Sequence, residues 1–174
     1  MGSSNNQTDP RDEIVEHIPD MRAFALNLTR NPTLADDLVQ DALVKAWRKF
    51  HQFQAGTNLR AWLFTILRNT FYSEIRKNKN DFGENGQDLD ELASIMHGQD
   101  AQIALIDFEK ALGLLPTEQR EALILVAAIG MSYDEAAETC GVAMGTIKSR
   151  INRGRKRLAE LLYGDAPIPA EEAE

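Results

Sequence analysis

The sequence is poor in cysteine, with Cys140 alone among 174 residues. A disulfide framework, a zinc finger and a cysteine-rich metal cluster each need several cysteines, so all three are excluded. No apolar run approaches the roughly 18 residues of a membrane-spanning helix, and the polar N-terminus lacks the apolar core of a signal peptide. We therefore expect a soluble cytoplasmic protein with no membrane partner. Cys140 itself is expected to be a small core residue rather than a redox sensor.

The sequence also lacks the common signatures of catalysis and of metal binding. His17, His51 and His97 lie too far apart to form a local metal motif, and each is expected on the surface or in a loop. No P-loop, G-x-G-x-x-G fingerprint or G-x-S-x-G turn occurs. We therefore expect a non-enzyme, with no catalytic residue, no metal site and no cofactor.

Residues 81–109 contain no Lys or Arg and carry eight acids. The flanking blocks are basic, with a net charge of +6 over residues 22–80 and six Lys or Arg between Lys148 and Arg157. Such blocks can bind phosphates even though the whole chain has a net charge of −8. The pattern predicts two domains and a linker, although plain solvation also explains the acidic stretch. The expected boundaries are an N-terminal segment 1–19, a domain 20–80, an acidic linker 81–100, a domain 101–163 and an acidic tail 164–174.

Apolar periodicity predicts helices in both domains, and no strand-like alternation of useful length appears. In the first domain, Pro19 suits a helix first turn, Thr33 is the expected N-cap of a second helix, and Asn58 is the expected cap of a third. In the second domain, we expect Thr117 to cap a helix that Gly130 ends. The expected fold is all-α, with two small helical domains joined by a flexible acidic linker.

The most informative segment is SYDEAAETCGVAMGTIKSRINRGRKRL, residues 132–158. Ser132 and Glu135 form a capping box, Gly141 supplies a tight turn, and a longer helix follows from about Met144. The inner stripe of that helix leaves a polar and basic set pointing outward. Arg and Lys suit guanine edges and Asn suits adenine, so the segment predicts a DNA-reading helix-turn-helix. The alternative is a cationic, solvated helix favoured by the helix dipole.

The segments DDLVQDALVKAWRKF and NLRAWLFTILRNTFYSEIRK closely resemble region 2 of extracytoplasmic-function (ECF) sigma factors. LLPTEQREALILVAAIGMSYDEAAETCGVAMGTIKSRINRGRKRL resembles their region 4, and within the family it is most similar to the EcfG-type general stress response factors. The resemblance implies a dissociable subunit that binds core RNA polymerase and directs promoter-specific initiation in a general stress response. It also implies promoter DNA and a small helical anti-sigma factor as partners.

The resemblance implies three sets of site residues. The polymerase clamp helices would contact Asp37, Gln40, Asp41, Val44 and Lys45. The melted −10 element would contact Phe53, Gly56, Asn58, Ile66, Arg68 and Asn69. The −35 element would contact Thr146, Lys148, Ser149, Arg150, Asn152 and Arg153. From the residues alone, the aromatics and bases interleaved along 60–77 suit stacking and phosphate contacts on single-stranded DNA, although Trp62 and Phe71 are expected to be mostly core.

Two other functions fit parts of the sequence. The first is a sigma-like mimic that sequesters an anti-sigma factor; such proteins carry a receiver domain, for which this chain has no room. The second is a helix-turn-helix repressor with a helical dimerisation domain, which leaves the aromatic and basic segment at 61–77 unexplained. Stable duplex binding without polymerase would indicate the repressor.

Overall fold

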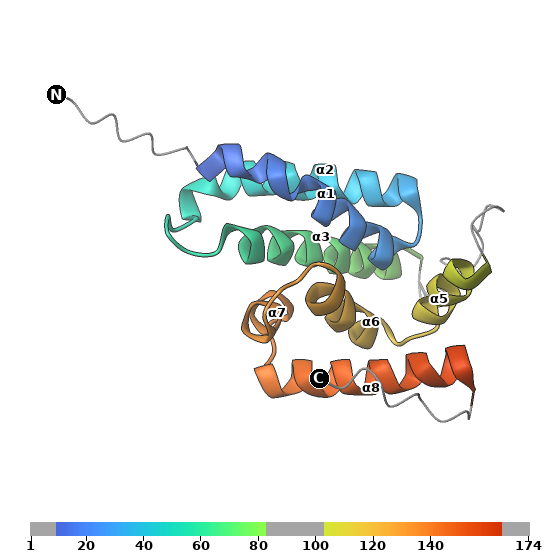
Figure 1. Cartoon of the computed structure of the whole chain (residues 1–174). Coiled ribbons are helices and arrows are strands. Elements are labelled where there is room, and N and C mark those ends of the chain that lie inside the picture. The colour runs from blue at the N-terminus through green and yellow to red at the C-terminus, as the bar shows by residue number, and fades with distance from the viewer. Residues whose placement is uncertain (1–9, 83–102, 165–174) are drawn as a thin grey trace.

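The computed structural model describes residues 10–82 and 103–164, and every regular element in these two ranges is helical. The expected all-α fold is confirmed. The first domain comprises α1 (Pro10–Thr29), α2 (Pro32–Lys49), the short 3-10 turn η1 (Phe50–Gln52) and α3 (Leu59–Phe82). The second comprises α5 (Ile103–Gly113), α6 (Thr117–Leu123), the π-helical segment η3 (Ile124–Ala128), α7 (Tyr133–Cys140) and α8 (Met144–Tyr163) (Figure 1). Nearly all of the expected acidic linker and tail lies outside the described residues.

Helix α1 is longer than the sequence predicts. The expected start at Pro19 was wrong, because the helix begins at Pro10 and continues through Pro19. A proline inside a helix removes one hydrogen bond to the carbonyl four residues earlier. That loss is tolerated here because Pro19 is exposed, while Ile14 and Met21, seven residues apart, are buried in the core on either side of it.

The starts of α2 and α3 are set by asparagine side chains. Asn31 caps α2, since its Oδ1 accepts hydrogen bonds from the N–H groups of Thr33 at 2.9 Å and Leu34 at 3.1 Å. The expectation that Thr33 is the cap was therefore wrong: Pro32 occupies the first helical position, which favours the residue before it as the cap. Asn58 caps α3 as predicted, with Oδ1 accepting from the Ala61 N–H at 3.0 Å.

The helix-turn-helix of the second domain follows its prediction closely. Ser132 and Glu135 form the expected capping box of α7, and Gly141 ends that helix at φ 66°, a conformation that favours glycine. The predicted cap at Thr117 was wrong, because α6 starts after Pro116 with no side-chain cap. Instead, the turn from α5 to α6 is held by the buried Arg120, which donates to the carbonyls of Gly113 at 3.0 Å and Leu115 at 3.4 Å.

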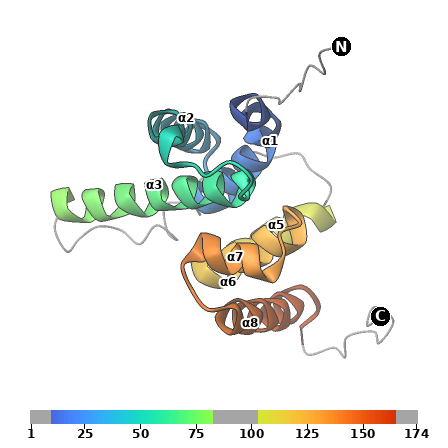
Figure 2. The same cartoon turned by 90° about the vertical axis from the view of Figure 1, so that its left-hand side faces the viewer.

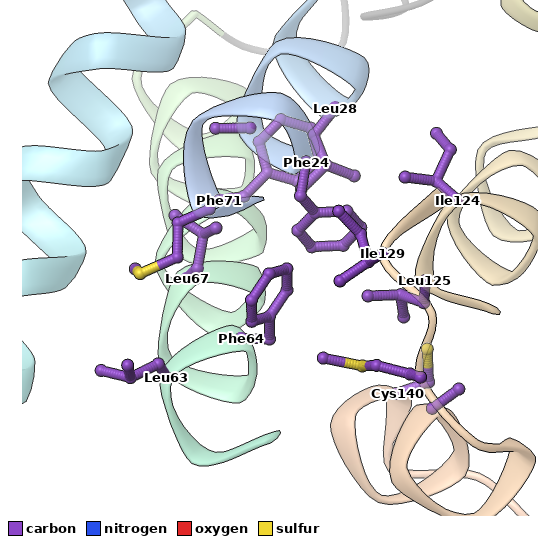
Figure 3. Close-up of a cluster of buried hydrophobic side chains, with 14 of the residues drawn as sticks. Phe24, Leu28, Leu63, Phe64, Leu67, Phe71, Ile124, Leu125, Ile129 and Cys140 are labelled. Atoms are coloured by element: carbon purple, nitrogen blue, oxygen red, sulfur yellow. The ribbon is translucent and has the colours of Figure 1, made fainter. Parts of the chain in front are cut away.

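The two domains pack against each other through one continuous apolar cluster. Phe24 of α1 and Phe64 of α3 lie with ring centroids 5.4 Å apart, and both are fully buried. Figure 3 shows these rings facing Leu125, Ile129 and other side chains of the second domain. The sequence predicts two domains on a linker and gives no indication of this contact.

The helices are arranged in layers, and this order places α2 and α8 far apart. Figures 1 and 2 both show α1 and α2 on one side, α3 next to them, then α6 and α7, and finally α8 on the opposite side. The outer faces of α2 and α8 therefore lie away from the interdomain contact, whereas one side of α3 lies within it.

Candidate polymerase and nucleic-acid interface

The outer face of α2 is a mixed charged and apolar surface. The inner face of the helix is buried through Ala35, Leu38, Val39, Ala42 and Ala46. The five residues that the sequence suggests for polymerase binding are all exposed on the other side: Asp37, Gln40, Asp41, Val44 and Lys45. Trp47 is 61% exposed on the same helix, and Lys45 Nζ donates to Thr70 Oγ1 at 3.3 Å. Val44 and Trp47, three residues apart, thus expose apolar area beside charged side chains, the combination found where proteins dock.

The loop before α3 is a preformed turn held by aromatic rings. Phe53 lies 5.6 Å from Phe50 and 5.3 Å from Trp62 between ring centroids, and Trp62 meets Phe50 edge-on at 6.0 Å. At the tip, Thr57 donates to the Gln54 carbonyl from its N–H at 3.1 Å and from Oγ1 at 2.7 Å. Gly56, at φ 89°, adopts the left-handed conformation that this turn requires. The rings fix the base of the loop and leave the tip exposed.

One of the suggested −10 residues, Arg68 of α3, forms an ion pair with the second domain. Its Nε lies 2.6 Å from Glu121 Oε1, and its Nη2 lies 3.2 Å from Oε2. The Tyr72 hydroxyl donates to the same carboxylate at 3.5 Å, and the Arg68 guanidinium lies over the Tyr72 ring at 4.6 Å. The Glu121 side chain is 0% exposed and that of Arg68 is 17% exposed, so the pair is largely shielded from water.

Burial and mutual charge act on the protonation of this cluster in opposite directions. Burial raises the pKa of the Glu121 carboxyl, and the hydrogen bond and charge of Arg68 only partly oppose that rise. Burial alone would lower the pKa of Arg68, but the hydrogen bond and charge of Glu121 outweigh it and raise the pKa. Burial also raises the pKa of Tyr72 to about 12, so its hydroxyl remains a donor at neutral pH.

Two further polar contacts join α3 to the second domain. Asn58 Nδ2 donates to Glu135 Oε1, and Arg60 Nη2 donates to the Ile129 carbonyl while also lying 3.3 Å from Asp20 Oδ2. The suggested −10 residues thus fall into three groups. Arg68 and Asn58 contact the second domain, whereas Gly56 and Asn69 are exposed; Phe53 and Ile66 are half-buried against the core.

Helix α8 presents the polar face that the sequence predicts. Its inner stripe is buried at Ile147, Ile151 and Gly154. Gly154 allows close approach of α6, because a Cβ at this position would lie 2.8 Å from Leu123 Cδ1. The suggested −35 residues on the outer side are exposed: Lys148, Ser149, Asn152 and Arg153.

Several of these outer side chains are held in place by neighbours. Arg153 donates to Ser149 Oγ at 2.9 Å, and Lys148 Nζ lies 5.8 Å from the centre of the Tyr133 ring. The structure places Arg150 differently, since its side chain is only 12% exposed and Nη2 donates to Glu118 Oε2 at 2.7 Å. Thr146, at the first turn of α8, is half-buried.

Three other expectations concern residues away from these faces. Cys140 is buried and free, as expected of a core residue, and burial raises the pKa of its thiol to about 12. Among the described residues, no group of three or more His, Cys, Asp and Glu is placed to hold a metal ion. Across the same residues no helix is both long and apolar enough to cross a membrane.

Sequence reasoning missed the partners on the second domain, above all Glu121 and Glu135. A signal for Glu121 was present, because REALILVAA places a charged residue directly beside an apolar run. A carboxylate in such a position is buried only if a cation meets it. The sequence could not indicate which cation, since Arg68 is 53 residues away.

The arrangement is that of a two-domain helical protein with a helix-turn-helix, and comparison with known proteins identifies it further. The family model described as Sigma-70 region 2 matches residues 14–80, and Sigma-70, region 4 matches residues 105–158. The chain is 48% identical over 155 residues to the ECF RNA polymerase sigma factor EcfG of Rhodopseudomonas palustris (strain TIE-1), covering 89% of this chain and 86% of that protein. The chain therefore belongs to the ECF sigma factors, which are non-enzymatic transcription initiation factors, and it resembles the EcfG type.

Solved structures agree with this assignment. The sigma factor RpoE of Bartonella quintana, crystallised with the anti-sigma factor NepR, matches with a TM-score of 0.74 and 45% identity, covering 91% of this chain and 99% of that one. A PhyRSL chain from a PhyRSL–NepR complex of Sphingomonas sp. Fr1 matches with a TM-score of 0.68 at 16% identity, over 96% of this chain and 98% of that one. The second likeness shows the fold alone.

Proposed function

We propose that this chain binds core RNA polymerase and directs promoter-specific transcription initiation in the cytoplasm, as part of a general stress response. The observation that carries the proposal is the match of both sigma regions, in order, within one relative that is 48% identical over most of the chain. The stress role rests on the likeness to EcfG. The exposed faces of α2 and α8 supply the surfaces that such a protein needs.

Polymerase binding is assigned to the outer face of α2. Asp37, Gln40, Asp41, Val44 and Lys45 are exposed together on it, which suits docking on the clamp helices. The charged side chains of this face would give orientation, and the apolar Val44 would give affinity. Replacement of Val44, 49% exposed, by Asp should weaken core binding without destabilising the first domain.

Promoter reading is assigned to two separate elements. The loop 53–58 and the residues Ile66, Arg68 and Asn69 of α3 would contact the melted −10 strand. The −35 duplex would be read by residues of α8: Thr146, Lys148, Ser149, Asn152 and Arg153. Arg150 would also face the DNA, and its hydrogen bond to Glu118 joins α8 to α6. Arg and Asn at exposed positions of a recognition helix are the side chains that pair with guanine and adenine edges.

A small helical anti-sigma factor is proposed as a regulatory partner. The support is that the Bartonella quintana relative, at 45% identity, was solved in complex with the anti-sigma factor NepR. Such a partner should prevent binding to core polymerase, which titration against the purified chain would detect.

The test of the function is reconstitution with sigma-free polymerase core on fragmented genomic DNA, with mapping of transcript 5′ ends. Discrete starts that share paired upstream motifs are expected. If neither transcript starts nor binding to core polymerase is detected, the proposal is contradicted. Duplex binding by the chain alone would then indicate a repressor, and its absence would favour the mimic.

A paired substitution on α8 tests base reading. Arg153→Ala should cost about 1–3 kcal/mol at matched −35 elements, while Arg157→Ala on the same helix should weaken all sequences alike if Arg157 contacts phosphate. Equal losses for Arg153→Ala on matched and scrambled elements would show that Arg153 does not read bases.

A further inference from the structure

Three aromatic rings from both ends of the loop 53–58 contact one another, and we name them the ring brace. Phe50 lies in η1 before the loop, Phe53 is the first residue of the loop, and Trp62 lies in the first turn of α3. Ring centroids are 5.6 Å apart for Phe50 and Phe53, 5.3 Å for Phe53 and Trp62, and 6.0 Å for Phe50 and Trp62. All three rings are half-buried against the hydrophobic core, so the ring brace is anchored in the folded domain.

The rings of the brace pack against one another and not around a gap. Aromatic side chains in direct contact have centroids about 4.5–7 Å apart, and all three pairs lie within this range. Their planes are inclined by 41°, 86° and 49°, whereas a base that stacks between two rings needs parallel planes with its own thickness between them. The ring brace therefore suits holding the backbone of the loop better than stacking a base of the −10 strand.

We infer that Phe50 and Trp62 are positioning residues for the −10 element, which hold the loop 53–58 in the shape that reads bases without contacting DNA themselves. The inference rests on the proposed −10 role of this loop. Neither side chain is among the residues that the resemblance to sigma factors suggests for DNA contact. Phe53, which is among them, connects the ring brace to the tip of the loop.

Each end of the loop is joined to one ring of the brace. At the start of the loop, the Phe53 N–H donates to the Phe50 carbonyl at 3.0 Å. At its end, where α3 begins, the Trp62 N–H donates to the Asn58 carbonyl at 3.1 Å. Since the rings of Phe53 and Trp62 meet across the loop at 5.3 Å, the ring brace fixes the distance between the two ends.

The tip of the loop is exposed, so its shape depends on how the ends are held. Gln54, Ala55, Gly56 and Thr57 are all exposed, and the turn is closed by the two hydrogen bonds from Thr57 to the Gln54 carbonyl. Solvent-exposed hydrogen bonds in a loop open readily. A loop that is already held in its bound shape loses less conformational entropy on binding, which raises its affinity for the correct strand. Phosphate contacts elsewhere carry no sequence information, so loss of the ring brace should lower discrimination between strands.

The test uses the full-length chain, two variants that each remove one ring, and two controls. Phe50→Leu and Trp62→Leu keep an apolar side chain, but each removes two of the three ring contacts. Phe50→Tyr keeps the ring. Phe24→Leu is the matched control, since Phe24 and Phe64 form a ring pair at a similar 5.4 Å in the same domain but outside the ring brace. Phe24 is fully buried, so this control should destabilise the fold at least as much as the ring variants do.

Two readouts separate the shape of the loop from the stability of the fold. The first is the exchange rate of the Thr57 amide hydrogen in the free chain, measured by nuclear magnetic resonance, which reports opening of the tip. The second is the ratio of open-complex formation by the reconstituted holoenzyme on a mapped promoter with an intact and with a scrambled −10 element, the −35 element being unchanged.

Both ring variants should speed Thr57 exchange and lower the promoter ratio about fivefold or more, since each lost ring pair changes an equilibrium by about two- to tenfold. Phe50→Tyr and Phe24→Leu should leave the exchange rate and the ratio as they are in the unaltered chain. Because Phe50 and Trp62 lie on either side of the loop, one ring variant decides the question if the other does not fold.

Each contrary outcome overturns a different statement. Unchanged Thr57 exchange in the ring variants would overturn the positioning role, and a ratio that falls nevertheless would show that the rings stack on bases directly. Faster exchange with an unchanged ratio would show that DNA itself orders the loop. An equal fall of the ratio for Phe24→Leu would reduce the effect to general destabilisation. Absence of both core binding and transcription with the unaltered chain would instead contradict the proposed function, whatever Thr57 exchange shows.

Discussion

The close contact between α6 and α8 leads to a prediction in which two glycines of the same helix respond in opposite ways. Gly154 is buried, and a Cβ there would lie 2.8 Å from Leu123 Cδ1, 3.3 Å from Leu123 Cγ and 3.4 Å from Gln119 Cβ. Gly145 is exposed near the start of α8, and a Cβ there would meet nothing within 4 Å. Replacement of either glycine by alanine raises helix propensity. The two substitutions therefore differ only in the space available to the new methyl group.

The magnitudes follow from these distances. Glycine to alanine within a helix is worth about 0.5–1 kcal/mol. At Gly154 the new methyl would force Leu123, itself only 7% exposed, out of its packed position, and such overpacking costs about 1–3 kcal/mol. Gly154→Ala should therefore lower the free energy of unfolding by about 1 kcal/mol, whereas Gly145→Ala should raise it by up to about 1 kcal/mol.

The assay is urea or thermal unfolding of the full chain followed by circular dichroism. For a chain of this size, 1 kcal/mol corresponds to about 2–4 °C in Tm, so the two variants should differ by several degrees and in sign. If Gly154→Ala raises the free energy of unfolding as much as Gly145→Ala does, the reasoning is refuted, because Leu123 then moves aside freely.

Three further predictions concern single groups in the core and at a cap. Phe64→Ala should lower the free energy of unfolding by about 3–5 kcal/mol, since Phe64 is fully buried at the domain contact, as denaturant titration would show. The Ser132 N–H holds the pKa of Glu135 below its usual range, so its stabilisation is present above the unfolded value of about 4.3 and is lost as pH falls through the lower folded pKa. Glu135→Gln should therefore flatten the acid side of the stability curve; an unchanged curve would contradict this assignment. Cys140, with its pKa raised to about 12, should react with a thiol reagent only as fast as the chain unfolds, so rapid labelling of the folded protein would count against its burial.

Local features of the fold were predictable from the sequence because nearby residues determine them. The capping box, the turn at Gly141 and the outward set on α8 follow from residues within one or two turns of each other, and the structure agrees at each. The resemblance to ECF sigma factors, read from continuous segments, is likewise confirmed. The start of α1 was missed because a proline usually marks a first turn, and burial on both sides of Pro19 outweighs that local preference.

The domain contact was not predictable for a physical reason. The Arg68–Glu121 pair joins positions 53 residues apart, and nothing in the local pattern of either helix selects the partner. Phe64 is one of the aromatics along 60–77 that were expected to suit stacking on single-stranded DNA. The structure instead buries it fully, in the same apolar cluster as Leu125 of the second domain. Site roles that depend on this contact could come only from the three-dimensional arrangement.

The Glu135 carboxylate is shared between the starts of two helices. Its Oε2 accepts from the Ser132 N–H at 2.6 Å at the start of α7, while Oε1 accepts from Asn58, the cap of α3. The first bond lies within the start of α7 and does not depend on the contact with Asn58. The N-terminal cap of α7 is therefore complete within residues 132–135, and the same carboxylate adds a contact to the first domain without weakening that cap.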